Sequence, residues 1–241
     1  MTQTLVLYDI VSNLPGISWS PNPAKPRFVL SYKGLPFVTV WVEYKDISTA
    51  MQAIGAKPDK RLDGTDVYPI PVLSDPNTGA LITDSLEITS YLEKTYPEKP
   101  VFPNNSESAI REFNSAHLDQ IITPSIKSIW VRSTDIMSPA SVKFFTKARS
   151  IDIALPWDQS YNEDWALLEK GYKNTVYKWY QKTEGKWFMG DTFSYADIVV
   201  ACYLLWFKRV LREDEWARIS SWNGGKWAQL LADVEKKCKL A

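Results

Sequence analysis

The stretch from residue 68 to residue 92, YPIPVLSDPNTGALITDSLEITSYL, decides the fold. Two apolar runs, at 68–73 and 80–83, flank the segment DPNTG at 75–79. Pro, Asn, Asp and Gly are typical of tight turns because their backbones readily adopt turn conformations. The pattern therefore predicts an antiparallel β-hairpin.

A helix is expected directly after the hairpin, at Asp84-Ser85. Both residue types are favoured N-caps, because their side-chain oxygens accept hydrogen bonds from the free N–H groups of a first helical turn. The apolar residues that follow are spaced for one face of a helix that runs to Tyr96.

Toward the N-terminus, the predicted elements alternate between strand and helix. Runs rich in Val and aromatic residues indicate strands, and a Gly after an apolar periodic segment indicates a helix end. A helix between two strands is typical of a parallel crossover, so the chain begins with an α/β half that contains a mixed four-stranded sheet. In chain order, we predict a strand at 5–8, a loop from 9 to about 26, a helix at 27–33, a strand at 37–42 and a helix at 46–55.

Toward the C-terminus, the pattern becomes helical throughout. A Pro-rich polar segment at 97–105 predicts a linker, and Pro124 should end the first helix after it. Ser194 with Asp197 three residues later is typical of a capping box. We therefore predict an α/β domain over 1–98 and an all-helical domain over 106–241. Further helices are expected after Ser138-Pro139, along an apolar stripe at 165–179, from Ser194 to about Val210, and after Gly225.

Charge and composition narrow the classes of function. The 28 Lys and Arg residues balance the 28 Asp and Glu residues, which gives no reason to expect nucleic acid or an anionic membrane as partner. The apolar run at 198–207 is too short to span a bilayer. The N-terminus lacks the basic and apolar regions of a signal peptide. We expect a cytoplasmic protein.

Few residues are available for metal binding or thiol chemistry. His117 is the only histidine, which excludes a multi-His zinc site and disfavours a His-based triad, so no metal is expected. Cys202 lies in an apolar run and is predicted to be buried, whereas Cys238 is predicted to be a surface thiol. Any chemistry must therefore depend on hydroxyls, backbone amides or the reactive group of a bound molecule.

Two features of the hairpin region favour binding of a peptide-like ligand. A cis bond at Ile70-Pro71 would turn the Ile70 backbone outward and free its N–H and C=O for an extended peptide. Asp84-Ser85 at a helix N-terminus could bind an α-carboxylate through free N–H groups, with the Asp84 carboxylate near the accompanying ammonium group.

A third feature is the polar loop after the first strand, which reads ISWSPN at 17–22. A hydroxyl in this loop could donate a hydrogen bond to a thiolate bound near the next helix. Ser20 is one candidate donor, Ser18 is close enough to compete, and Asn22 could supply an amide donor instead. A solvated turn is the alternative interpretation.

Together, the segment 68–92 and the capping box at 194–197 resemble the glutathione transferases. The resemblance covers both halves and implies a thioredoxin-like N-terminal domain, a helical C-terminal domain and glutathione as co-substrate. It also implies that Ile70, before cis Pro71, pairs with the cysteinyl backbone of glutathione. Asp84-Ser85 would then hold the γ-glutamyl end.

A narrower resemblance involves Ser20-Pro21 and the downstream Tyr32-Lys33-Gly34. These residues are similar to the fungal etherase-like, serine-type glutathione transferases and to the bacterial β-etherases of lignin breakdown. This resemblance implies Ser20 at the active site and an affinity for plant phenolics. The chain differs from tyrosine-type classes, because Tyr8 lies within the first strand, and from cysteine-type classes, because the loop contains no Cys.

These resemblances imply a detoxifying transferase that activates the glutathione thiolate for attack on hydrophobic or aromatic electrophiles, with β-etherase-like or peroxidase side activity. The co-substrate should lie between the domains, with Ile17, Trp19, His117 and Ile121 as candidate walls, although core packing is an alternative for each. The family resemblance implies a homodimer.

Two other functions stay open at this point. A non-catalytic, ligandin-like protein for phenolic or hydrophobic compounds would use the same fold and the same 32 aromatic residues, namely 11 Trp, 12 Tyr and 9 Phe. A protein-interaction module that retains the fold is the third, and the Asp84-Ser85 pair argues against it.

Overall fold

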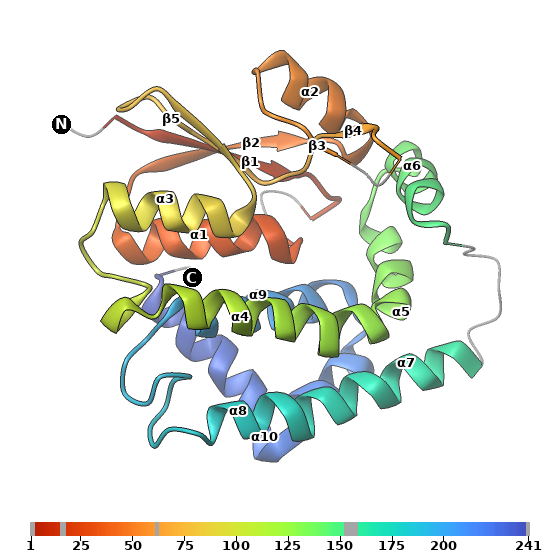
Figure 1. Ribbon diagram of the computed structural model, residues 1–241. Coiled ribbons are helices and arrows are strands. Elements are labelled where there is room, and N and C mark those ends of the chain that lie inside the picture. Colours follow the sequence, from red (N-terminus) through yellow and green to blue (C-terminus); the bar gives the residue numbers. More distant parts are fainter. Residues whose placement is uncertain (1–2, 15–17, 61–62, 152–158, 240–241) are drawn as a thin grey trace.

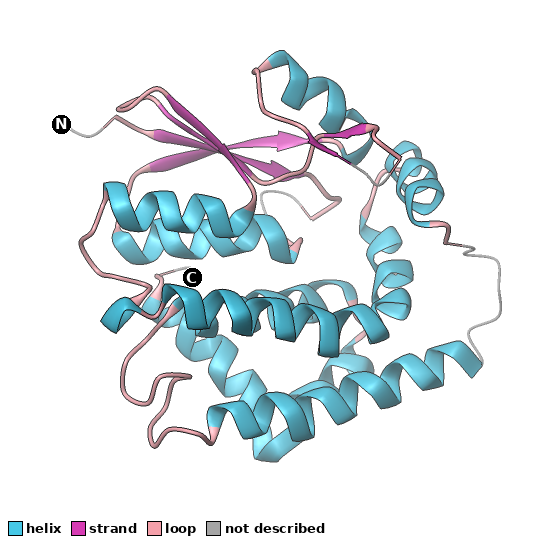
Figure 2. Ribbon diagram, in the orientation of Figure 1, coloured by secondary structure: helices cyan, strands magenta, loops and turns pink. Residues whose placement is uncertain are grey.

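The computed structural model describes residues 3–14, 18–60, 63–151 and 159–239. A four-stranded sheet with helices forms the N-terminal half, and helices form the C-terminal half (Figure 1, Figure 2). The predicted thioredoxin-like domain followed by a helical domain is confirmed. Among the described residues, no helix has the length and apolarity needed to cross a membrane.

The strands of the sheet are arranged in the order β2-β1-β5-β6. β1 is parallel to β2, whereas β5 is antiparallel to both β1 and β6. Helices α1 and α3 lie side by side on one face of this sheet, and α2 lies on the other (Figure 1). The bounds are β1 (Leu5–Ile10), α1 (Pro21–Lys33), β2 (Phe37–Val42), η1 (Tyr44–Asp46), α2 (Ile47–Ala53), β3 (Asp59–Lys60), β4 (Asp66–Val67), β5 (Val72–Asp75), β6 (Ala80–Thr83) and α3 (Ser85–Thr95).

The sheet register brings separate chain segments to one end of the sheet. Tyr8 pairs with Val72 between β1 and β5, and Val72 pairs with Thr83 between β5 and β6. The end of β1, the start of β5 and the end of β6 are therefore adjacent. Pro71 precedes β5 and Asp84 follows β6, so both lie at this end. Helix α1 starts here too, because it returns the chain to the beginning of the parallel strand β2.

The first helix begins at Pro21 and not at Arg27, so the predicted start was wrong. Pro21 and Pro23 lie in the first turn, where N–H groups have no partner within the helix, so their missing donors cost nothing there. Pro26 lies inside the helix and forgoes one backbone hydrogen bond. The helix packs against α3 and α9, and this burial compensates for the lost bond.

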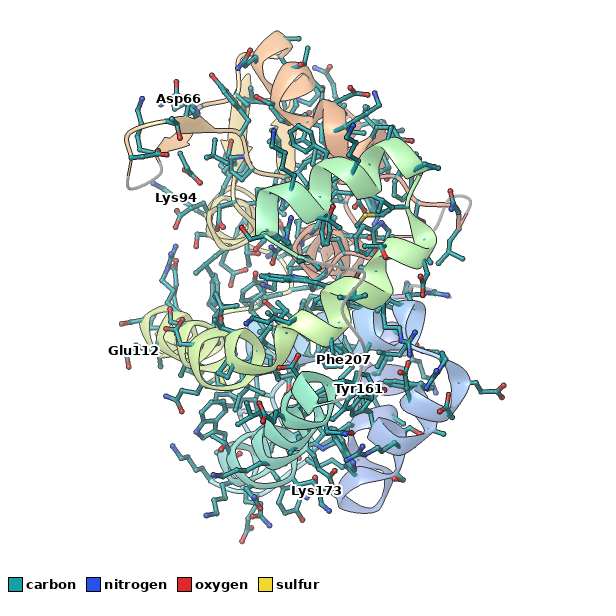
Figure 3. The ribbon with its side chains drawn as sticks, turned by 90° about the vertical axis from the view of Figure 1, so that its right-hand side faces the viewer. Asp66, Lys94, Glu112, Tyr161, Lys173 and Phe207 are labelled. Carbon is teal, nitrogen blue, oxygen red and sulfur yellow. The ribbon has the colours of Figure 1, made fainter. Side chains whose placement is uncertain are left out.

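The helical half is built around α9 (Tyr195–Val210), whose residues are buried except Lys208 and Arg209. In Figure 3, Phe207 lies among the helices, whereas Glu112 and Lys173 point away from them. The other bounds are η2 (Pro103–Asn105), α4 (Glu107–His117), η3 (Leu118–Ile122), α5 (Thr123–Ser133), η4 (Thr134–Ile136), α6 (Pro139–Arg149), α7 (Gln159–Lys170), η5 (Gly171–Val176), α8 (Tyr177–Tyr180) and α10 (Glu213–Lys237).

Two predictions about this half need correction. The helix expected to end at Pro124 continues through it, because the π-helix η3 changes the hydrogen-bonding pattern immediately before this proline. Cys238 is fully buried at the end of α10, because that end packs inward, and Cys202 is buried as predicted. The helical path of α10 breaks at residues 222–225, which agrees with a last helix that starts after Gly225.

Candidate functional site

A cavity of about 240 Å³ lies between the two halves of the chain. The N-terminal half contributes the end of β1, the start of α1 and the start of η1, and the helical half contributes η3, α5, α6 and α9. Six of the lining residues are aromatic, which suits a flat apolar ligand. The lining consists of Ile10, Trp19, Ser20, Pro21, Asn22, Tyr44, Leu118, Thr123, Ile126, Trp130, Phe145, Arg149, Tyr203 and Trp206.

Ser20 is the N-cap of α1, and its hydroxyl makes no capping hydrogen bond. An N-cap side chain normally accepts from the second or third N–H of the helix. The third residue here is Pro23, which has no N–H to donate. The Ser20 hydroxyl therefore has no partner among the described residues, and it lies on the cavity wall. It is free to donate to a ligand.

The Ser18 hydroxyl is already engaged. Its Oγ donates to Oδ2 of Asp9 over 2.7 Å, and both residues are buried. The Arg27 guanidinium donates to the same Oδ2 over 2.9 Å. Burial raises the pKa of Asp9, and the charge of Arg27 and the Ser18 hydrogen bond oppose this rise. Ser18 thus stabilises a buried carboxylate and is not available to a thiolate.

Asn22 lies on the exposed side of the α1 N-terminus and also lines the cavity. Its Oδ1 accepts a hydrogen bond from Nζ of the buried Lys25 over 3.2 Å. This bond orients the side chain and leaves the Nδ2 donors without a partner among the described residues. Asn22 therefore stays a second possible donor.

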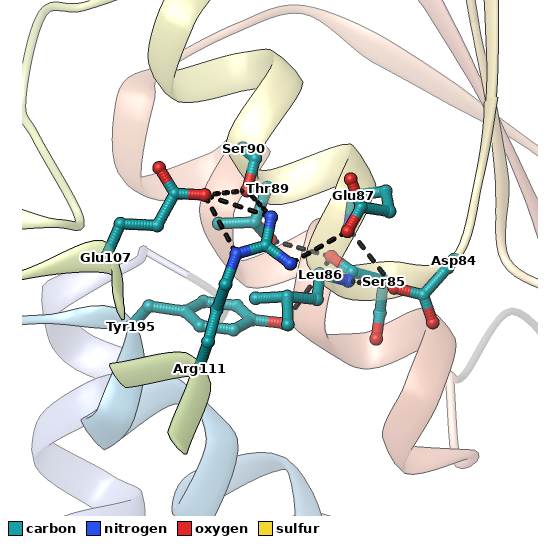
Figure 4. Close-up of polar contacts among 9 residues, drawn as sticks. All are labelled: Asp84, Ser85, Leu86, Glu87, Thr89, Ser90, Glu107, Arg111 and Tyr195. Atoms are coloured by element: carbon teal, nitrogen blue, oxygen red, sulfur yellow. Dashed lines mark hydrogen bonds and ion pairs between the residues drawn. The ribbon is translucent and has the colours of Figure 1, made fainter. Parts of the chain in front are cut away.

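The hairpin residues present a set of unpaired groups at the same end of the sheet. The Ile70-Pro71 bond is cis, as predicted, and the Ile70 backbone makes no hydrogen bond to another described residue. Oδ1 of Asp84 accepts from Leu86 N–H over 2.7 Å and from Glu87 N–H over 3.1 Å, which leaves Oδ2 as a free acceptor (Figure 4). The Ser85 N–H and hydroxyl have no partner among the described residues. These groups can bind both charges of an amino-acid end.

Side chains from the helical half hold this part of α3 in place. The Ser85 carbonyl accepts from the Tyr195 hydroxyl over 3.4 Å, and Arg111 of α4 donates to Glu87 over 2.8 Å and to Ser90 over 2.7 Å (Figure 4). The N-terminus of α3 is therefore oriented by contacts across the two domains, which the sequence did not indicate.

Only some of the residues predicted to form the co-substrate pocket line this cavity. Trp19 lines the cavity, and Ile17 lies outside the described residues. His117 and Ile121, expected as walls, do not line this cavity, because their side chains turn into the core of the helical half. Several lining residues were not predicted from the sequence, among them Tyr44, Trp130, Phe145, Arg149, Tyr203 and Trp206.

His117 should make the stability of the protein pH-dependent. Its side chain is fully buried, and its Nδ1 has no hydrogen-bond partner within the part of the chain that the structure describes. Burial, aided by the charge of Lys25, lowers its pKa from 6.5 to about 3. Below pH 6.5 the imidazole of His117 is protonated in the unfolded chain but stays neutral in the folded chain. The free energy of unfolding therefore falls as the pH drops toward 3. Between pH 6.5 and pH 5 we expect a loss of about 2 kcal/mol.

The measurement is the free energy of unfolding against pH for the wild type and for His117→Gln. Other titrating groups are shared by both proteins, so the difference between the two curves isolates His117. The glutamine variant should lack this part of the slope. Parallel curves from pH 7 to pH 5 would contradict the assignment.

A thioredoxin-like domain joined to a helical domain, with a cavity between them, is the architecture of the glutathione S-transferases. The N-terminal domain model of these proteins matches residues 19–95, and the C-terminal domain model matches residues 110–236. The chain belongs to the glutathione S-transferase family.

Particular relatives lie among fungal proteins. The crystal structure of a glutathione S-transferase of Ceriporiopsis subvermispora in complex with glutathione is 36% identical, with a TM-score of 0.90 and 98% of each chain covered. A glutathione transferase of Phanerochaete chrysosporium is 32% identical, with a TM-score of 0.86 and the same coverage. The glutathione S-transferase-like protein ustS of Aspergillus flavus is 27% identical, over 95% of this chain and 91% of that protein.

Proposed function

We propose that this protein is a glutathione transferase that activates the glutathione thiol at the N-terminus of α1, with Ser20 as the hydrogen-bond donor. The observation that carries the proposal is the free Ser20 hydroxyl on the wall of the interdomain cavity. The glutathione held by the similar Ceriporiopsis subvermispora protein supports the choice of thiol.

The chemistry requires a thiolate, because a thiol with a pKa near 8.5 is mostly protonated at pH 7. A helix N-terminus usually stabilises an anion through several N–H groups. Pro21 and Pro23 remove two of these donors from α1. The Ser20 hydroxyl and the amides of Asn22 therefore carry most of the stabilisation. The thiolate attacks an electrophilic carbon of a ligand in the cavity.

The rest of glutathione would bind the groups at the end of the sheet. The Ile70 N–H and C=O pair with the cysteinyl backbone. The Ser85 N–H and hydroxyl bind the γ-glutamyl carboxylate, and Oδ2 of Asp84 accepts from its ammonium group. Each of these groups lacks a partner among the described residues, which supports this arrangement.

The proposal extends to the serine-type, etherase-like class, on the basis of Ser20-Pro21 at the start of α1. Its co-substrates would be aromatic or hydrophobic electrophiles, including aryl ethers. The protein would also have peroxidase side activity and a role in detoxification. A cytoplasmic homodimer is part of the same proposal.

The test combines calorimetry with glutathione and a rate assay with phenyl isothiocyanate. We expect glutathione to bind and to be conjugated faster than in the absence of protein. Failure to bind glutathione would overturn the proposal and would favour an interaction module on the same fold.

A second candidate function, ligandin-like binding of phenolic compounds, is favoured by one observation, the six aromatic residues around the cavity. Glutathione-independent binding of a flavonoid, without conjugation of any electrophile, is the result expected of a pure ligandin. Both functions can operate in one protein, because the cavity and Ser20 are adjacent.

A further inference from the structure

The described lining of the cavity carries a single formal charge, which is positive. Its lining contains 14 described residues, and Arg149 is the only one that carries a formal charge. No carboxylate of the described residues lines it. A cavity with aromatic walls and one cation favours an aromatic ligand that carries a negative charge.

Arg149 lies at the end of α6 and is surrounded by aromatic rings. Its guanidinium carbon is 4.0 Å from the ring centre of Phe145 and 5.2 Å from those of Tyr44 and Trp130. Such stacking holds a guanidinium group in a fixed plane. Arg149 therefore occupies a defined position on the cavity wall and does not extend freely into solvent.

Most of the hydrogen-bonding capacity of Arg149 is unused. Its one hydrogen bond to a described residue goes to the Tyr44 hydroxyl, and no described carboxylate forms an ion pair with it. Arg27, Arg111 and Arg132, in contrast, each pair with a carboxylate. A guanidinium group has five N–H donors, and two parallel donors match the two oxygens of a carboxylate.

We infer that Arg149 makes the cavity selective for aromatic carboxylates, with the ring between the aromatic walls and the carboxylate on the guanidinium group. This inference rests on the proposed function, because it takes the cavity as the co-substrate site. It adds the substrate class, namely aromatic acids and electrophiles that carry a carboxylate. Neutral phenolics of the same shape should bind more weakly.

The test compares naphthalene-2-carboxylate with naphthalene-2-carboxamide, which has nearly the same shape and no charge, by calorimetry at pH 7.5. The wild type should bind the carboxylate about tenfold more tightly, the ratio expected for a hydrogen-bonded charge. Arg149→Met should reduce this ratio to about one, because a methionine fills the same space without donors. Arg149→Lys should keep part of the preference, because lysine keeps the positive charge but lacks the two parallel N–H donors of the guanidinium group.

The matched control is Arg218→Met, which removes the same charge from an exposed pair with Glu169 outside the cavity and should leave the preference unchanged. Equal binding of the two ligands by the wild type would overturn the inference. It would also be overturned if Arg149→Met weakened both ligands equally, because Arg149 would then only shape the cavity.

Failure of the inference and failure of the proposed function can be distinguished, because calorimetry is done without glutathione. A wild type that prefers the carboxylate but conjugates no isothiocyanate would refute the transferase and keep the inference. A wild type that conjugates phenyl isothiocyanate but shows no preference would refute the inference alone.

Discussion

Replacing Ser20 with alanine should lower kcat/KM for phenyl isothiocyanate at pH 7 by about 30-fold, which corresponds to about 2 kcal/mol for a hydrogen bond to an anion. The pKa of the thiol of bound glutathione should rise by about 1.5, because the thiolate loses the hydrogen bond that stabilised it relative to the protonated thiol. Folding stability should stay nearly unchanged, since the Ser20 hydroxyl makes no capping bond.

The measurement is the pH–rate profile of kcat/KM, with the ultraviolet absorbance of the bound thiolate as an independent titration. The loss should shrink at high pH, where the thiol ionises without help. This recovery distinguishes a lost donor from a distorted site.

Two neighbouring variants are the controls for Ser20. Ser18→Ala removes a hydroxyl that donates to the buried Asp9 over 2.7 Å, so it should lower stability and leave the thiol pKa unchanged. Asn22→Ala removes the competing amide donor. A thiol pKa that moves in Asn22→Ala and not in Ser20→Ala would transfer the role to Asn22.

Asp197→Ala should destabilise the fold by about 3 kcal/mol and lower Tm by about 10 °C, since several buried donors lose one acceptor. Its Oδ1 accepts from Phe188 N–H over 2.8 Å and from the Tyr180 hydroxyl over 3.1 Å. Its Oδ2 accepts from the N–H and the hydroxyl of Ser194 over 3.0 and 3.1 Å. The carboxylate therefore joins α8, the loop after it and the start of α9.

Thermal and urea unfolding at pH 7.5 measure this effect. Burial raises the pKa of Asp197 to about 6, against the effect of its hydrogen bonds, so the group is ionised at this pH. Asp191→Ala is the control, because Asp191 is exposed and makes no ion pair with a described residue; its effect should stay within about 0.5 kcal/mol. Equal stability of the two variants would show that the capping box does not stabilise the helical domain.

Helices and turns were predicted correctly where the capping and turn residues agree with the apolar spacing around them. The turn at 75–79, the N-cap Asp84 and the capping box at 194–197 each depend on residues a few positions apart, and all three were found where expected. The start of α1 was missed because Pro26 opposes a helix locally, whereas contacts with α3 and α9 favour it.

The site was only partly predictable for the same reason. Asp84 and Ser85 could be selected because a helix N-terminus is a local feature of sequence. Ser20 and Asn22 could be selected because they lie in a short polar loop after a strand. The choice between Ser18 and Ser20 required the position of Asp9, which no spacing reveals. Residues of the cavity wall on α5, α6 and α9 have the helical spacing of core residues, and the pattern does not tell which of them face a cavity.

The amino-acid sequence by itself therefore determined the order of elements, the two-domain architecture and the caps at the starts of α3 and α9, because these depend on short-range hydrogen bonding and on apolar periodicity. Only the tertiary structure decided that His117 and Cys238 are buried and that Ser18 is engaged. Only the tertiary structure decided, too, that Ser20 and Arg149 face the cavity with no capping bond for the first and no described carboxylate beside the second. These properties arise from contacts between residues distant along the chain, and their energies depend on the packing of one helix against another.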